Sequence, residues 1–127
     1  MGASGLDLAD SVDVCALSDL HPERIREVRV GPLRAAAALH SGRVYVFQGQ
    51  CPHRGGPLTR GAIRPRVSGE RPGEMVLDSE HPVVTCPWHN FEYSLDTGAA
   101  LWNPELCIRV FPSEVVDGRV RVWKTVS

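Results

Sequence analysis

The sequence predicts an all-β chain, and three observations support this fold class. The 12 glycines and 10 prolines are about 17% of the 127 residues, against a usual ~12%, which favours tight turns over long helices. Apolar residues occur in short runs, several of them separated by turn pairs that contain glycine. The hydrophobic content of 43% and the charged content of 23% are typical of a folded globular chain. We therefore expect about eight to ten short strands in a single domain, residues 1–127.

Two hairpins are predicted from turn pairs. Residues 34–48 hold two apolar runs on either side of Ser41-Gly42, and Asp117-Gly118 separates two runs near the end of the chain. The alanines of the first hairpin could instead form a helical turn, because alanine is the best helix former. About five residues are too few for a stable helix, so a strand is favoured.

Several further elements follow from the pattern of apolar residues. The second hairpin is predicted from the runs 107–111 and 120–123, and the remaining predicted strands are 12–16, 27–30, 83–86 and 91–94. Residues 19–26 are predicted to form a single capped helical turn, with Pro22 near its start. The insertion 64–80 is rich in Pro, Gly and charge, so we expect a solvated excursion in which 75–77 adds a short strand.

Charge and hydropathy exclude some partners. The formal net charge of -1 gives no broad positive field for nucleic acid or an anionic membrane. The longest apolar runs, 35–39 and 44–47, are too short to cross a bilayer, and the first residues lack a signal-peptide pattern. These features predict a cytoplasmic protein that binds neither nucleic acid nor membrane, and that is a monomer or a weak oligomer.

Two similar patches carry the chemistry. The first, Cys51-Pro52-His53, holds one cysteine and one histidine, and so does the second, Cys86-Pro87-Trp88-His89. Side chains two or three residues apart in a turn project about 5–7 Å from each other, so each pair can reach one small inorganic centre. A tetrahedral zinc usually takes a Cys pair and then a His pair, which fits this order poorly. A two-iron centre explains the interleaving, with both cysteines on one iron and both histidines on the other.

This pattern resembles the Rieske [2Fe–2S] family, whose signature is Cys-x-His followed by Cys-x-x-His. The resemblance covers about residues 27–124 and implies a small antiparallel β sandwich or barrel whose cluster-binding subdomain consists of loops 51–58 and 86–93. It also implies one [2Fe–2S] cluster per chain. The implied ligands, and the implied metal-binding residues, are Cys51, His53, Cys86 and His89.

The charge of such a cluster predicts its use. Two ferric ions, two sulfides and two thiolates sum to zero when the imidazoles are neutral, which makes one-electron reduction easier than in a four-thiolate cluster. High-potential family members carry two bridging cysteines, where this chain has Gly56 and Trp88, and a cluster-bonding serine, where it has Phe91. We therefore expect a potential in the lower part of the range of about -150 to +300 mV. Tyr93 matches a tyrosine that bonds a ligand sulfur in those members, and a purely packing role is equally open.

The remaining cysteines, histidines and tryptophans are assigned structural roles. Cys15 and Cys107 are expected to be small buried residues, and Trp102 and Trp123 to belong to the core. His21, His40 and His81 lie near predicted turns, where we expect them to be solvated.

The resemblance implies a Rieske-type ferredoxin, which is an electron carrier and not an enzyme. Its expected partners are a flavin-dependent ferredoxin reductase and a terminal oxygenase. An oxygenase would need a further domain with a mononuclear iron, for which 127 residues leave no room. Two alternatives remain at this stage: a small subunit of a nitrite-reductase-like enzyme, and a zinc-stabilised interaction module.

Overall fold

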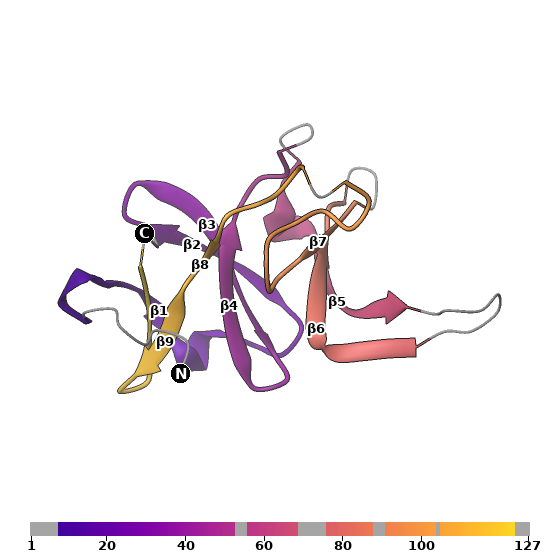
Figure 1. Cartoon of the computed structure of the whole chain (residues 1–127). Coiled ribbons are helices and arrows are strands. Elements are labelled where there is room, and N and C mark those ends of the chain that lie inside the picture. Colours follow the sequence, from indigo (N-terminus) through magenta and orange to yellow (C-terminus); the bar gives the residue numbers. More distant parts are fainter. Residues whose placement is uncertain (1–7, 53–55, 69–75, 88–90, 104, 124–127) are drawn as a thin grey trace.

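A computed structural model describes residues 8–52, 56–68, 76–87, 91–103 and 105–123, with the backbone alone at residues 8, 66–68 and 76–80. Short strands dominate this part of the chain, which confirms the all-β prediction, and its helical segments are single 3₁₀ turns (Figure 1). None of these described helical segments is long and apolar enough to span a bilayer. In chain order the elements are η1 Leu8–Asp10, β1 Val12–Ala16, η2 Leu17–Asp19, β2 Ile25–Val30, β3 Leu33–His40, β4 Arg43–Gln48, η3 Leu58–Arg60, β5 Ala62–Ser68, β6 Val76–Thr85, β7 Glu92–Ser94, β8 Val110–Phe111, β9 Ser113–Val116 and β10 Arg119–Val122.

The strands form three antiparallel sheets. The central sheet has the order β2-β3-β4-β8, and the flanking sheets have the orders β1-β10-β9 and β5-β6-β7. Figure 1 shows the central sheet between the other two, with β1 and β9 on one side and β5 to β7 on the other. The central sheet is therefore covered on both faces.

The alanine run of β3 is explained by this position. Ala35, Ala36, Ala37 and Ala38 are all fully buried, because successive residues of a strand point to opposite faces. Ala36 and Ala38 belong to the hydrophobic cluster shared with β5 to β7, and Ala35 and Ala37 to the cluster shared with β1 and β10. Small side chains on both faces let the flanking layers approach closely. The predicted strand is confirmed, and the helical alternative is wrong.

Both predicted hairpin turns are present. Ser41 and Gly42 have φ of 50° and 78°, and Asp117 and Gly118 have φ of 51° and 75°. Two successive positive φ values match the twist of the strands that such a turn connects. The pairing of β3 with β4 and of β9 with β10 follows.

The predicted helical turn over 19–26 is wrong. The helical turn is η2, one turn earlier, and strand β2 already begins at Ile25. Pro22 forms a bridge with Leu39, and Ile25 and Arg26 pair with alanines of β3. Pairing with the central sheet therefore overrides the local capping signal.

The 64–80 insertion contains a hairpin. Strands β5 and β6 pair from Ala62↔Thr85 to Ser68↔Val76, with a register shift between Arg64 and Arg66. Pro65 lies at this shift, where its missing N–H removes a ladder hydrogen bond. The predicted strand 75–77 is the start of β6, except for Met75, which lies outside the described residues.

Three predicted burial states are also wrong. His40 is 4% exposed, with Nδ1 2.8 Å from both carboxylate oxygens of Glu23. Cys107 is exposed in the irregular segment before β8, and Trp102 is 46% exposed. The predictions for Cys15 and Trp123 are confirmed, since both are buried.

Candidate metal centre

The two cysteine patches form hairpin loops of the same construction. The first loop is closed by the bridge Gln50↔Pro57 and the second by the pair Thr85↔Glu92. Inside each, the cysteine N–H donates to the carbonyl of the fifth residue after it, from Cys51 to Gly56 at 2.7 Å and from Cys86 to Phe91 at 2.8 Å. Each cysteine therefore holds the same place in its loop.

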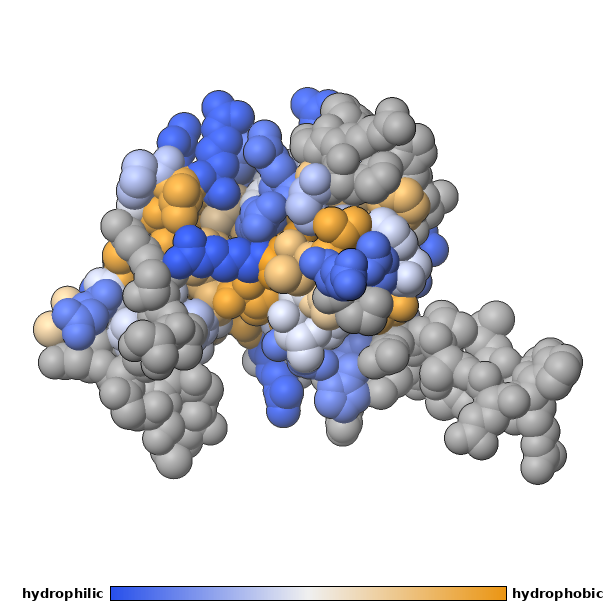
Figure 2. Space-filling model, turned by 45° about the horizontal axis from the view of Figure 1, so that its top comes forward, coloured by the Kyte–Doolittle hydropathy of each residue, from blue (hydrophilic) through white to orange (hydrophobic). Residues whose placement is uncertain are grey.

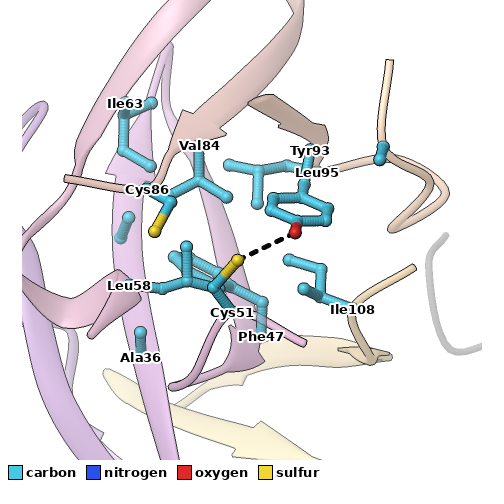
Figure 3. Packing of buried hydrophobic residues seen from close by; sticks show 12 residues of the cluster. Ala36, Phe47, Cys51, Leu58, Ile63, Val84, Cys86, Tyr93, Leu95 and Ile108 are labelled. Atoms are coloured by element: carbon cyan, nitrogen blue, oxygen red, sulfur yellow. Dashed lines mark hydrogen bonds between the residues drawn. The ribbon is translucent and has the colours of Figure 1, made fainter. Parts of the chain in front are cut away.

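The two cysteine side chains meet in one buried cluster. Cys51 and Cys86 are each 2% exposed, neither is in a disulfide, and both belong to the hydrophobic cluster that also holds Leu58, Val84 and Tyr93. Figure 3 shows both sulfur atoms pointing into the space between these side chains. Two buried, unlinked sulfur donors from matching loops suit a thiolate-bound iron centre.

Tyr93 supplies a polar contact inside this cluster. Its hydroxyl lies 2.9 Å from Sγ of Cys51, and its side chain is fully buried (Figure 3). Burial, together with the contact to Cys51, raises the pKa of Tyr93 far above its usual range. The hydroxyl therefore keeps its proton at neutral pH and can donate a hydrogen bond to a sulfur that carries negative charge. Of the two roles that the sequence left open for Tyr93, the structure therefore shows the contact with a cysteine sulfur and not packing alone.

Gly61 brings the two loops together. It ends η3 after the first loop, and a Cβ atom at this position would clash with the carbonyl oxygen of Thr85, the residue before Cys86. A residue with a side chain would push the loops apart. The sequence contains no signal for this contact, because it depends on tertiary structure.

The side chain of Gln48 fixes the base of the first loop. Its Nε2 donates to the carbonyl of Gln50 at 2.7 Å, and its Oε1 accepts from the N–H of Arg109 at 3.1 Å. The N–H of Gln48 also donates to the Arg109 carbonyl at 2.8 Å. Cys51 therefore follows a segment that is tied to the chain just before β8. No pattern in the sequence marks Gln48 as a residue that positions the loop.

Comparison with known proteins identifies the family of this chain. The profile of the family described as "Rieske [2Fe-2S] domain" matches residues 10–112. The chain belongs to the Rieske family. A Rieske-type [2Fe–2S] cluster is therefore its cofactor, as predicted from the sequence, and the family match favours it over a zinc site.

Two relatives of this Rieske chain are ferredoxins by name. The ferredoxin component of the alkene monooxygenase system of Xanthobacter autotrophicus is 28% identical over 116 residues, covering 91% of this chain and 83% of the relative. Ferredoxin CarAc of Metapseudomonas resinovorans is 31% identical over 111 residues, covering 86% of this chain and 89% of the relative.

Solved structures share the fold. A chain in the complex of reduced oxygenase and oxidized ferredoxin of carbazole 1,9a-dioxygenase has a TM-score of 0.68 and 29% identity, with coverage of 93% of this chain and 98% of that one. A putative NADH-dependent nitrite reductase small subunit from Mycobacterium tuberculosis has a TM-score of 0.73 at 24% identity, covering 92% and 96%. This second likeness concerns the fold alone.

The Rieske loops differ from the high-potential pattern at Phe91. Its ring packs against Trp102 with centroids 4.7 Å apart, and it offers no hydroxyl to the cluster. The predicted ligands His53 and His89, and also Trp88, lie outside the described residues.

Proposed function

We propose that this chain is a Rieske-type ferredoxin that binds one cluster through Cys51, His53, Cys86 and His89. The cluster supplies a centre that gains and loses one electron. The observation that carries this proposal is the meeting of two buried cysteine sulfurs from matching loops, neither of them in a disulfide, with the Tyr93 hydroxyl aimed at one of them.

The proposed role is to take electrons from a flavin-dependent reductase and deliver them to a terminal oxygenase. The two ferredoxin relatives support it, because they are matched over most of their own length. Ferredoxin and oxygenase also occur together in a solved complex of carbazole 1,9a-dioxygenase. In this role the chain is a carrier that turns over no substrate itself.

We further propose that residues 1–127 act as one domain, as a monomer or weak oligomer in the cytoplasm. The free thiols of Cys15 and Cys107 agree with a reducing compartment. The hairpin of β5 and β6 is an extension of this domain beside the second loop, and we assign it no role in cluster binding.

Cysteine variants test the cluster assignment. The protein purified without oxygen should hold two iron and two acid-labile sulfide per chain and give a rhombic EPR signal when reduced. Cys51→Ser and Cys86→Ser should lose iron and the visible spectrum. Cys15→Ser, at a buried free cysteine far from the loops in sequence, should keep both. A full iron content in Cys51→Ser, or one zinc per chain, would contradict the assignment.

A binding experiment tests the partners. Immobilised protein should retain a flavin-dependent ferredoxin reductase and a terminal oxygenase, and the reductase with NADH should reduce it faster than it reduces Cys51→Ser. Retention of a nitrite reductase, with no transfer from any ferredoxin reductase, would favour the small-subunit alternative.

A further inference from the structure

A cleft of about 410 Å³ lies beside the first cluster loop. Its walls are the turn 32–34 between β2 and β3, the segment 48–50 that leads into Cys51, and the side chains of Arg109 and Phe111. Arg34 also lines a smaller depression that reaches Pro57 on the other side of the loop. The cleft therefore flanks the loop that carries Cys51.

The rim of this cleft is positively charged. Arg34 and Arg109 line it, and no carboxylate is among its described lining residues. Arg29 stands directly opposite Arg34 in the pairing of β2 with β3, and both are exposed. Like charges directly opposite each other are destabilising, so a negative partner would relieve this arrangement. Glu27 lines the smaller depression, but within the described residues no carboxylate oxygen is within 4 Å of the Arg34 guanidinium.

The cleft also has an apolar component. The Arg109 guanidinium lies 5.0 Å from the centre of the Phe111 ring, which limits its freedom before binding. Leu33 is 41% exposed at the rim. Figure 2 shows hydrophobic surface between hydrophilic side chains on the face turned to the viewer. Arginine beside exposed apolar surface is typical of protein interfaces, whereas a small anion would use the charges alone.

We propose that this cleft docks a segment of a redox partner that carries carboxylates next to apolar side chains. The partner's carboxylates would pair with Arg34 and Arg109, and an apolar side chain would contact Leu33. Because Gln50 both lines the cleft and precedes Cys51, such docking places the partner beside the first loop. This inference rests on the proposed electron-carrier function and names the chemistry of its partner.

A labelled peptide tests the docking without electron transfer. We would measure, by fluorescence anisotropy at low ionic strength, the binding of a fluorescein-labelled octapeptide of alternating glutamate and leucine to the cluster-loaded protein. The double variant Arg34→Glu/Arg109→Glu should raise the dissociation constant at least tenfold, and Arg34→Gln/Arg109→Gln should give an intermediate rise. The matched control Arg43→Glu, an exposed arginine at the opposite end of β4, should change it less than twofold.

Several outcomes would overturn the proposal. These are no binding to the wild-type protein, equal weakening by Arg43→Glu, or equal affinity for a lysine-leucine peptide. Complete displacement by millimolar phosphate would assign the cleft to a small anion instead. Unchanged visible and circular dichroism spectra show that each variant is folded and loaded. If the protein lacks a redox-active cluster but binds the peptide as expected, the electron-carrier function fails and the cleft still binds acidic segments.

Discussion

Tyr93 places a hydroxyl against the Cys51 sulfur inside an otherwise apolar cluster. With Cys51 as a cluster ligand, as we propose, this hydrogen bond stabilises the reduced, more negative form, so Tyr93→Phe should lower the reduction potential. A net difference of about 1 kcal/mol corresponds to about 40 mV for one electron, so a decrease of tens of millivolts is expected. A redox titration followed by EPR measures it.

Tyr45 offers the matched control for this measurement. It packs against the same cluster but is only half-buried, and the structure does not place its hydroxyl on a cysteine. Tyr45→Phe should leave the potential within a few millivolts of the wild-type value. Equal decreases in both variants would mean that the hydroxyl of Tyr93 acts through general polarity and not through its contact with Cys51.

The residue types in the sequence predict some features of individual side chains and not others. The two cysteine patches could be singled out because a metal centre needs particular donors at short spacing along the chain, and their assignment as ligands stays a prediction. The burial of His40 could not be predicted, because it depends on a tertiary contact with Glu23. The roles of Gln48 and Gly61 could not be predicted for the same reason, because their partners Arg109 and Thr85 lie 61 and 24 residues away in the sequence.

The junction between η3 and β5 controls how closely the two loops approach. Gly61→Ala should force the Thr85 backbone away and destabilise the fold by about 1–3 kcal/mol. It should also lower the iron content, because the loops that carry Cys51 and Cys86 separate. Iron analysis and thermal unfolding measure the two effects.

Gly42→Ala is the control that separates the effect of backbone strain from the effect of moving the two cysteine loops apart. Gly42 has φ +78° with nothing within 4 Å of its would-be Cβ, so the variant carries only the left-handed backbone penalty of about 1–2 kcal/mol. Comparable destabilisation with full iron content is expected. If Gly61→Ala also retains full iron, the approach of the loops does not govern cluster binding.

Strands β1 and β10 are joined by a charged pair. Nη2 of Arg119 lies 2.8 Å from Oδ1 of Asp13, and this hydrogen bond lowers the pKa of the Asp13 carboxyl. Because the folded-state pKa is lowered, the stabilisation is fully present above the ordinary value of about 3.9 and is lost as the pH falls from there through the lowered folded-state pKa. Asp13→Asn should therefore reduce the unfolding temperature at pH 7, and by less at pH 2.5.

Asp117→Asn is the control for this pair. Asp117 lies in the turn between β9 and β10, where asparagine tolerates the positive φ, and it makes no ion pair within the described residues. Its unfolding temperature should follow that of the wild-type protein at both pH values. A pH-independent loss in Asp13→Asn would assign the effect to shape and not to charge.

Elements were easiest to predict where the signal is local. The turns at Ser41-Gly42 and Asp117-Gly118 depend on residues that accept positive φ, and both hairpins were predicted. The helical turn at 19–26 was misplaced because the central sheet captures this segment through Pro22 and Ile25. The alanine strand was predicted, but its burial on both faces was not, because that burial depends on how the two flanking sheets pack against the central sheet.

The whole molecule has two hydrophobic clusters on opposite faces of the central sheet. One contains both loop cysteines and residues of β5 to β7, and the other is formed with β1 and β10 and contains neither loop cysteine. In the proposed assignment the [2Fe–2S] cofactor binds only the folded cysteine loops, so its removal should destabilise the side with the loop cysteines more than the side with β1 and β10.

Hydrogen exchange after iron removal tests this division. Chelation of iron from the reduced protein should speed amide exchange in β6 and β7 at least tenfold, with less than a threefold change in β1 and β10. Val120→Ala perturbs the other side of the sheet, because Val120 is fully buried in the hydrophobic cluster formed with β1 and β10. This variant should lower the free energy of unfolding by about 2 kcal/mol and leave the iron content unchanged. Equal acceleration on both sides after chelation would show that the shared strand β3 couples them into one cooperative unit, so that the cofactor stabilises the entire fold.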